Sequence, residues 1–399
     1  MINQKSVQLG SVRSVIRELF EYGKKRKAQI GEENVFDFSL GNPSVPPPAQ
    51  VEEALENVLK TRDPVQVHGY TSAQGDASVR SAIAGYISKN FGVPQTADLI
   101  YMTCGAAASL AITFNALLNA GDEVITIAPY FPEYKVFCEH AGGVLVPVKG
   151  EAGTFQPDIA AVRAAITPRT KAVLINSPNN PSGVVYTEER IMQLCKVLKE
   201  CKERGQTIYL IADEPYRELV FGGVKVPYIM NFYDESIVCY SFSKSLSLPG
   251  ERIGYIAIAP AMRSADEVYA AVCGAGRALG YVCAPSLFQL IIPKVLGLTA
   301  DISVYKRNRD TLSAALESYG FTVVRPDGAF YLFVQSPEPD SDAFAERAKE
   351  HELLIVSAKS FGVEGYVRIS YCVSPEMIAR SLPAFRALAL SYGLKRDKK

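Results

Sequence analysis

A lysine among hydroxyl residues is the feature of this sequence best suited to chemistry. Lys244 follows an apolar run, with Ser241 and Ser243 just before it and Arg252 eight residues after it. A desolvated lysine can form a Schiff base with a carbonyl compound. Hydroxyls and a planar guanidinium are suitable ligands for a phosphate. The alternative is a solvated lysine where a strand leads into a loop, but the neighbouring residues favour Schiff-base chemistry beside a phosphate.

Polar residues also stand at two sites upstream of this lysine. Asp213 ends the apolar run 208–213, which places it at the carboxyl edge of a sheet, where open α/β folds bind ligands. Its alternative role is to cap a following helix. Asn180 lies in the turn-rich segment 176–183, and the Asn180–Pro181 bond is a candidate cis peptide. Both side chains are therefore candidates for the same site.

The order of these residues resembles that of one protein family. The motifs S-x-S-K-x(7)-R, D-x-x-Y and N-P-S-G carry the resemblance, which runs from about residue 36 to residue 368. They resemble the class I/II aminotransferases, which are aspartate-aminotransferase-like (fold type I) pyridoxal-phosphate enzymes. The matching residues in chain order are Asn180, Asp213, Tyr216, Lys244, Arg252 and Arg368. The resemblance implies pyridoxal 5'-phosphate as cofactor.

The resemblance also implies roles around the ring of that cofactor. Lys244 would be the lysine that forms the Schiff base and then carries a proton as general base and acid. Asp213 would pair with the pyridine nitrogen, while Asn180 and Tyr216 would hydrogen-bond the phenolic oxygen. Lys244, Asp213 and Tyr216 are the implied catalytic residues. Phe131 matches the aromatic residue that stacks on the ring, with a plain core phenylalanine as the alternative.

The phosphate of the cofactor has its own implied ligands. By the resemblance, Ser241 and Arg252 bind it, and Ser243 adds a further contact. A strand-to-helix turn, formed by Gly105, Ala106 and Ala107, would offer backbone N–H groups at a helix N-terminus. The family often has a hydroxyl residue in this turn, so the alanines here predict a weaker grip on the phosphate.

The substrate carboxylate and the partner subunit are also implied by the resemblance. Arg368 matches the arginine that binds the carboxylate, since its planar fork suits a bidentate pair. Gly41 and Asn180 complete the implied substrate-binding set. Tyr70 resembles the tyrosine that reaches the phosphate in the neighbouring subunit, which implies a homodimer with shared active sites.

The alternation of strands and helices predicts an α/β fold. We expect strands at 99–103, 123–128, 143–147, 172–176, 208–213, 237–241 and 252–259. Helices are expected at 106–119, 131–141, 158–166 and 187–204, the last capped by Thr187. Several strands are continuously apolar, which suits a sheet covered on both faces. These elements predict a large domain, residues 48–290, with a mostly parallel seven-stranded sheet flanked by helices.

The two ends of the chain have a different pattern. A helix at 12–27 and a strand at 35–40 are expected before the large domain, and the apolar stretch 279–298 is expected to be a core helix. Further helices are predicted at 302–319, 341–351 and 375–392, and further strands at 321–324, 330–333, 353–357 and 366–370. Residues 1–47 and 291–399 together then form a smaller α+β domain.

Composition excludes several classes of protein. The 399 residues carry 42 basic and 42 acidic side chains, without the basic excess expected of a nucleic-acid-binding protein. The eight cysteines form no C-x-x-C pair and lie mostly in apolar runs, which predicts reduced thiols in a cytoplasmic protein. Three histidines without a zincin pattern predict no metal site. No membrane span is expected.

These features together predict a pyridoxal-phosphate-dependent aminotransferase acting on an amino acid and a 2-oxo acid. A carbon–sulfur β-lyase of the same fold is the alternative, because it would use the same lysine, aspartate and arginine. The preferred side chain of the substrate stays open. Arg277 and Lys60 are charges without an assigned place, whereas Tyr130 and Tyr134 could shape an apolar or aromatic pocket.

Overall fold

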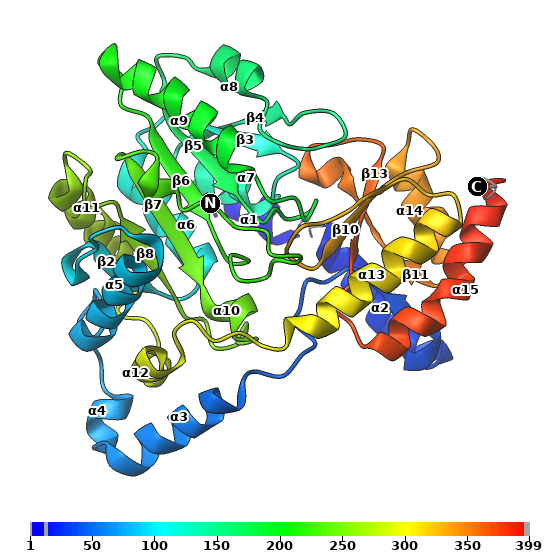
Figure 1. Cartoon of the computed structure of the whole chain (residues 1–399), viewed down its shortest axis with the longest axis horizontal. Coiled ribbons are helices and arrows are strands. Elements are labelled where there is room, and N and C mark those ends of the chain that lie inside the picture. The colour runs from blue at the N-terminus through cyan, green and yellow to red at the C-terminus, as the bar shows by residue number, and fades with distance from the viewer. Residues whose placement is uncertain (1, 12–14, 395–399) are drawn as a thin grey trace.

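A seven-stranded sheet forms the centre of the computed structural model, which describes residues 2–11 and 15–394. The strand order is β2-β8-β7-β6-β5-β3-β4 (Figure 1). All pairs are parallel except those that β8 makes with β2 and β7. The prediction of a mostly parallel seven-stranded sheet is therefore confirmed. The strands are β2 (Ile100–Thr103), β3 (Glu123–Ala128), β4 (Val144–Lys149), β5 (Thr170–Asn176), β6 (Tyr209–Asp213), β7 (Ser236–Ser241) and β8 (Gly254–Ile258).

Helices flank this sheet and connect its strands. At the start of α9 (Glu188–Glu203), Thr187 Oγ1 accepts a hydrogen bond of 3.3 Å from the Arg190 amide, which confirms the predicted cap. In Figure 1, α3 and α4 extend away from the rest of the chain. The other helices here are α3 (Ala49–Thr61), α4 (Pro64–His68), α5 (Ala77–Phe91), α6 (Ala106–Leu117), α7 (Glu133–His140), α8 (Ile159–Ala165), α10 (Phe242–Ser245), α11 (Ala265–Ala278) and α12 (Ser286–Val295).

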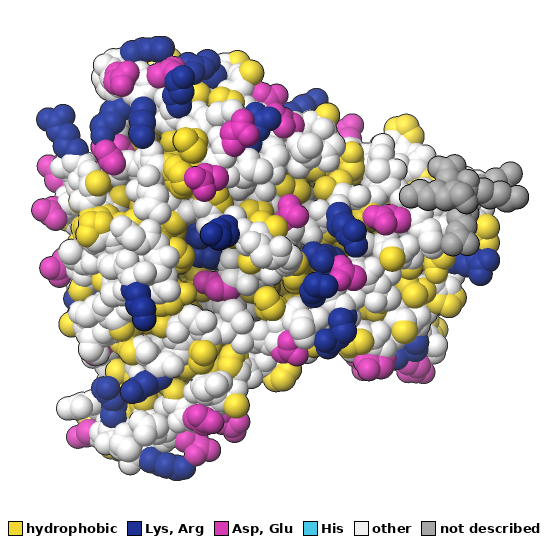
Figure 2. Space-filling view, viewed as in Figure 1, with side chains coloured by type: hydrophobic (Ala, Val, Ile, Leu, Met, Phe, Trp, Pro, Cys, Tyr) yellow, Lys and Arg dark blue, Asp and Glu magenta, His cyan; other side chains and the backbone are white. Residues whose placement is uncertain are grey.

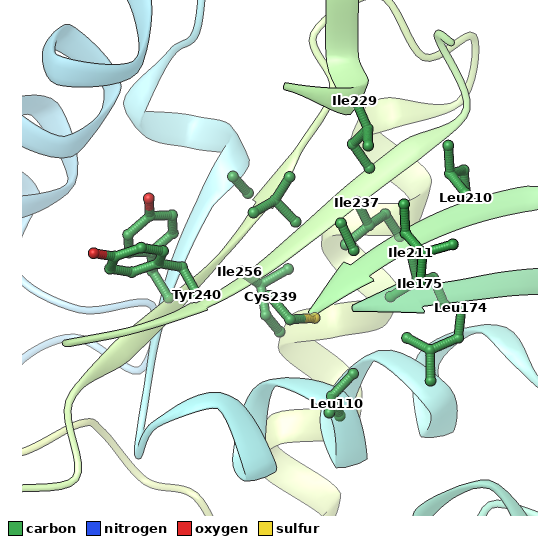
Figure 3. Close-up of a cluster of buried hydrophobic side chains, with 14 of the residues drawn as sticks. Leu110, Leu174, Ile175, Leu210, Ile211, Ile229, Ile237, Cys239, Tyr240 and Ile256 are labelled. Atoms are coloured by element: carbon green, nitrogen blue, oxygen red, sulfur yellow. The ribbon is translucent and has the colours of Figure 1, made fainter. Parts of the chain in front are cut away.

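The central strands are buried because both faces of the sheet are covered. Every residue of β2, β3, β7 and β8 is buried, which explains their continuously apolar sequences. Figure 3 shows side chains of β5, β6 and β7 gathered together, with Leu110 of α6 beneath them in this view. Burying one large apolar side chain contributes about 1.5–3 kcal/mol. This rigid core fixes the carboxyl ends of β5, β6 and β7 side by side.

The two ends of the chain come together beside a four-stranded antiparallel sheet. Its order is β12 (Val356–Ser357), β13 (Tyr366–Ser370), β10 (Tyr331–Gln335) and β9 (Val323–Val324). A separate parallel pair joins β1 (Phe36–Asp37) to β11 (Leu353–Leu354), so the N-terminal segment contacts the C-terminal one. The helices of this part are α1 (Gln4–Ser11), α2 (Val15–Ile30), α13 (Ile302–Ser318), α14 (Ser341–Lys349) and α15 (Pro375–Ser391).

Several expected elements differ in extent from the structure. The strand expected at 35–40 is only Phe36–Asp37, because only these two residues pair with β11. The helix expected across 279–298 begins only at Ser286, since Gly280 is left-handed (φ 82°) and Pro285 precedes the first turn. Residues 12–14 of the helix expected at 12–27 lie outside the described residues, and α2 runs on to Ile30.

Two apolar clusters form the interior, one around the large sheet and one around the four-stranded sheet. The second cluster also takes Tyr216, Leu219 and Phe221 from the segment that follows β6. The domain limits 48–290, 1–47 and 291–399 stay a prediction. On the face shown in Figure 2, basic and acidic side chains are interspersed. None of the described helices is long and apolar enough to span a membrane.

Candidate active site

A cavity of about 300 Å³ opens at the carboxyl ends of the central strands, next to the four-stranded sheet. It is where the rule for open α/β sheets expects a ligand. Most residues that the sequence singled out line it. They are Gly41, Ala106, Ala107, Phe131, Asn180, Asp213, Tyr216, Ser241, Ser243, Lys244, Arg252 and Arg368. Gly105 lies against Arg252 at the cavity's edge, and Tyr70 lies elsewhere, on the surface.

Lys244 points its amine toward the N-terminal segment of the chain. It lies in the short helix α10, which starts where Ser241 caps the amide of Ser243 (3.2 Å) directly after β7. Its Nζ donates a hydrogen bond of 2.7 Å to the Gly41 carbonyl. Burial lowers the pKa of Lys244 to about 8, and the positive charges of Arg252 and Arg368 lower it further. A sizeable fraction of this amine is therefore neutral, and nucleophilic, near physiological pH.

Asp213 is a buried carboxylate with one oxygen unused. Tyr134 Oη donates to its Oδ2 at 2.5 Å, while Oδ1 is buried without a hydrogen-bond partner. Burial raises the pKa of Asp213 to about 7, which the Tyr134 hydrogen bond opposes and the charge of Glu214 reinforces. The Asn176 amide donates to the Asp213 carbonyl at 2.8 Å and fixes the strand end. A buried oxygen of this kind needs a cationic or hydrogen-bonding ligand.

Arg368 and Asn180 form the opposite wall. Arg368 is buried on β13, where Nη1 donates to Asn180 Oδ1 at 3.1 Å and Nη2 donates to the Ser39 carbonyl. Its Nε has no partner, and its guanidinium lies over the rings of Tyr331 (4.8 Å) and Phe361 (5.0 Å). The structure thus presents a desolvated cation at the cavity with donor capacity for an anion. The Asn180–Pro181 bond is cis, as predicted.

A second group of donors lies at the start of α6. Gly105 adopts φ +84°, and a Cβ there would lie 2.8 Å from Arg252 Nη2. Without a side-chain cap, the first N–H groups of α6 have no helical partner. Arg252, itself left-handed at φ 51°, donates to the Pro249 carbonyl (2.8 Å) and Ser243 Oγ (3.5 Å). Backbone N–H groups, hydroxyls and a guanidinium therefore converge, which is suitable for a phosphate.

Several residues that the sequence did not assign to the site complete it. Tyr331, Asn176 and Ile16 line the cavity, and Tyr134 holds Asp213. Asn176 was detectable, since it ends β5 as Asp213 ends β6. Tyr331 gave no signal, because only the pairing of β10 with β13 brings it beside Arg368.

Comparison with known proteins identifies the family. The family model for aminotransferase class I and II matches residues 33–385, so the chain belongs to that family. A probable aspartate/prephenate aminotransferase of Aquifex aeolicus is 34% identical over 377 residues, which cover 88% of this chain and 89% of that protein. An aspartate aminotransferase of Thermotoga maritima is 31% identical and covers 92% of this chain and 95% of its own length.

Solved structures agree with the sequence relatives. An aminotransferase from Eubacterium rectale superposes with a TM-score of 0.96 at 56% identity, covering 98% of this chain and 99% of that chain. The aspartate aminotransferase of Thermus thermophilus with maleate gives a TM-score of 0.86 at 28% identity, covering 97% and 99%. The protein is therefore an aminotransferase with the aspartate-aminotransferase fold, as the sequence predicted. None of these comparisons supports the carbon–sulfur lyase alternative.

Proposed function

We propose that this aminotransferase binds pyridoxal 5'-phosphate at Lys244 and moves an amino group between an amino acid and a 2-oxo acid. One observation carries the proposal: a single cavity holds an unpartnered carboxylate oxygen of Asp213 and a lysine whose pKa is lowered to about 8. A pyridine nitrogen would satisfy the first group, and an aldehyde would react with the second.

The residues around the cofactor's ring have the donors and charges that it needs. When bound, the cofactor supplies an electron sink that lets a bond at the amino acid's Cα break. Asp213, once ionised, favours a protonated ring nitrogen because opposite charges attract. Asn180 Oδ1 already accepts from Arg368, which leaves the amide NH₂ of Asn180 to donate to the phenolic oxygen, together with Tyr216. Phe131, which meets Tyr134 edge to face at 5.6 Å, would cover one face of the ring.

The phosphate would be held by two sets of donors. Ser241, Ser243 and Arg252 provide side chains, and the first turn of α6 provides backbone N–H groups at Ala106 and Ala107. Gly105 allows Arg252 to approach the turn closely. A hydroxyl side chain is missing from this turn, so the grip depends on the backbone and on Arg252.

Arg368 and Lys244 would position the substrate and move its proton. Arg368 has an unpartnered Nε and would hold the substrate carboxylate, with Asn180 and Gly41 beside it. Fixing the carboxylate directs the Cα–H bond toward Lys244. In its neutral form, Lys244 takes that proton as general base and later returns it as general acid.

A homodimer is part of the same proposal. The Tyr70 side chain is 87% exposed, and so are two further apolar residues nearby, Val65 at 78% and Val282 at 61%. Ser286 donates to the Gly69 carbonyl at 2.6 Å, so the α12 end lies against the Tyr70 loop. A second copy covering this surface would bury the apolar groups and bring Tyr70 to its phosphate site. The cytoplasmic location and the absence of nucleic-acid and membrane partners stay predictions.

The Lys244→Ala variant tests the proposed function. It is expected to lose transamination with 2-oxoglutarate and the absorption band of lysine-bound pyridoxal phosphate. Lys60→Ala is the matched control, because Lys60 is exposed and pairs with Glu56 on α3. A panel of amino donors read with the wild-type protein gives the side-chain preference. Wild-type turnover by Lys244→Ala would refute the assignment.

A further inference from the structure

Tyr331 is a buried tyrosine at the cavity that the proposed mechanism does not use. It begins β10, where it pairs with Ser370 of β13, while Arg368 pairs with Phe333. Side chains two residues apart in a strand share a face. Tyr331 and Arg368 are therefore diagonal neighbours on the face of the sheet that borders the cavity.

Tyr331 contacts three groups that the mechanism does use. Its Oη lies 2.8 Å from Tyr216 Oη. The Arg368 guanidinium lies 4.8 Å from its ring centre, in cation–π geometry. A Cβ at Gly41 would fall 2.0 Å from Tyr331 Oη, so the hydroxyl lies against the backbone whose carbonyl accepts from Lys244. One side chain thus joins the Lys244, Tyr216 and Arg368 positions.

The direction of the Tyr216–Tyr331 hydrogen bond follows from counting protons. Burial raises the pKa of Tyr331 to about 12 and that of Tyr216 well above its usual value, so both hydroxyls stay protonated. Each then has one proton, and only one of them lies between the two oxygens. If Tyr331 donates, the proton of Tyr216 is free to point into the cavity. The phenolate oxygen of a bound cofactor would need that proton.

We propose that Tyr331 is a positioning residue: its hydroxyl donates to Tyr216 and aims the Tyr216 proton at the cofactor, and its ring holds Arg368 in place for the substrate carboxylate. The proposal rests on the proposed function. Hydrogen bonds in series strengthen one another, so a Tyr216 that accepts from Tyr331 is a stronger donor. Two separable effects follow, one through the hydroxyl and one through the ring.

Tyr331→Phe removes the hydroxyl and keeps the ring. In the holoenzyme, Tyr216 then becomes a weaker donor to the phenolic oxygen, and the pH midpoint of the bound cofactor's absorption band rises by roughly 0.3–0.7 unit. The KM for the 2-oxo acid stays within about two-fold, because the ring still lies under Arg368. In a Tyr216→Phe background the same substitution has no further effect on the midpoint, as a double-mutant cycle requires.

Tyr331→Leu removes the hydroxyl and the ring. It shows the same midpoint shift and also raises the KM for the 2-oxo acid by about five- to thirty-fold, the worth of a desolvated cation–π contact. Tyr233→Phe is the matched control, since that buried hydroxyl donates to the Ile208 carbonyl and Tyr233 is not among the cavity residues. It leaves both the midpoint and the KM unchanged.

The outcomes separate this inference from the proposed function. A wild-type midpoint in Tyr331→Phe, or the same shift from Tyr331→Phe when Tyr216 is already Phe, overturns the role of the hydroxyl. An unchanged KM in a folded, cofactor-loaded Tyr331→Leu overturns the role of the ring. If the wild-type protein binds pyridoxal phosphate without any Lys244-dependent absorption band, the proposed function itself fails.

Discussion

The Tyr134 hydroxyl donates a 2.5 Å hydrogen bond to Asp213 Oδ2, and the other oxygen of the same carboxylate is buried without a partner. The protein therefore supports one side of Asp213 and leaves the other side for a ligand. Without that ligand the carboxylate resists ionisation, because burial raises its pKa to about 7. The cost of keeping this site ready should be measurable in the cofactor-free protein.

The stability of the cofactor-free protein is expected to depend on Asp213. An aspartate in the unfolded chain has a pKa of about 3.9, so between pH 4 and 7 the folded protein holds a proton that the unfolded protein has released. Raising the pH through this range therefore favours unfolding. Relative to Asp213→Asn, the wild type should lose about 2–3 kcal/mol of unfolding free energy between pH 5 and pH 8. Urea denaturation at both pH values measures the difference.

The comparison of the two variants removes the contribution of the other titrating groups. Asn keeps the size of the side chain and an oxygen for the Tyr134 hydroxyl, so packing changes little. Parallel pH profiles for the wild type and Asp213→Asn would contradict a raised pKa at this position.

Capture of pyridoxal phosphate should follow the ionisation of Lys244. Only the neutral amine attacks an aldehyde, and burial lowers the pKa of Lys244 to about 8. The rate at which the cofactor-free protein develops the lysine-bound absorption band should therefore rise with pH and level off above about 8. Stopped-flow absorbance gives this rate. N-acetyl-lysine under the same conditions supplies the pH dependence of the cofactor itself.

A neighbouring charge offers a check on that midpoint. Arg368→Gln removes a positive charge that lowers the Lys244 pKa, so its midpoint should lie higher than in the wild type. A wild-type rate that still climbs toward pH 10, as for an ordinary lysine, would rule out the lowered pKa.

Gly105 should be essential to phosphate binding. Its backbone is left-handed at φ +84°, and a Cβ would lie 2.8 Å from Arg252 Nη2. Gly105→Ala should weaken pyridoxal-phosphate affinity roughly 10- to 100-fold through backbone strain and displacement of Arg252. Equilibrium dialysis measures the Kd. Gly205→Ala is the matched control, because Gly205 is also left-handed (φ +88°) but has open space around it. Equal Kd values for the two variants would contradict the role of this turn.

The extent to which the sequence predicts the site follows from how each residue is placed. Asp213 and Lys244 end or follow buried strands, and the carboxyl ends of neighbouring parallel strands meet at one edge. Their neighbourhood could thus be inferred from strand order alone. Tyr331 was not predicted, since its contacts with Tyr216 and Arg368 depend on antiparallel register in the other sheet.

The fold was predictable where burial imposes a pattern and less so where it does not. All seven central strands were found because both faces are covered and their sequences are continuously apolar. The pair β1–β11 has only two residues on each strand, too few for a periodic signal, so its partner strand could not be identified from the sequence. The apolar stretch 279–298 was expected to be one helix, but Gly280 and Pro285 interrupt it before α12.

The shared active site can be tested by mixing two inactive variants. If Tyr70 serves the neighbouring subunit, a heterodimer of Tyr70→Ala and Lys244→Ala contains one complete site. That site uses Lys244 of the first chain and Tyr70 of the second. Random reassembly makes half of the dimers mixed, with one complete site of two, so roughly a quarter of wild-type activity should return. Activity after denaturation and refolding of the mixture is the measurement.

A second mixture decides whether the recovery has the proposed cause. Asp213 and Lys244 line the cavity of the same chain, so Asp213→Asn mixed with Lys244→Ala forms no complete site and should recover no activity. The exposed position of Tyr70, away from the cavity of its own chain, is the reason to expect different results from the two mixtures. If neither mixture recovers activity although mixed dimers form, Tyr70 does not complete the partner's site, and its exposure needs another explanation.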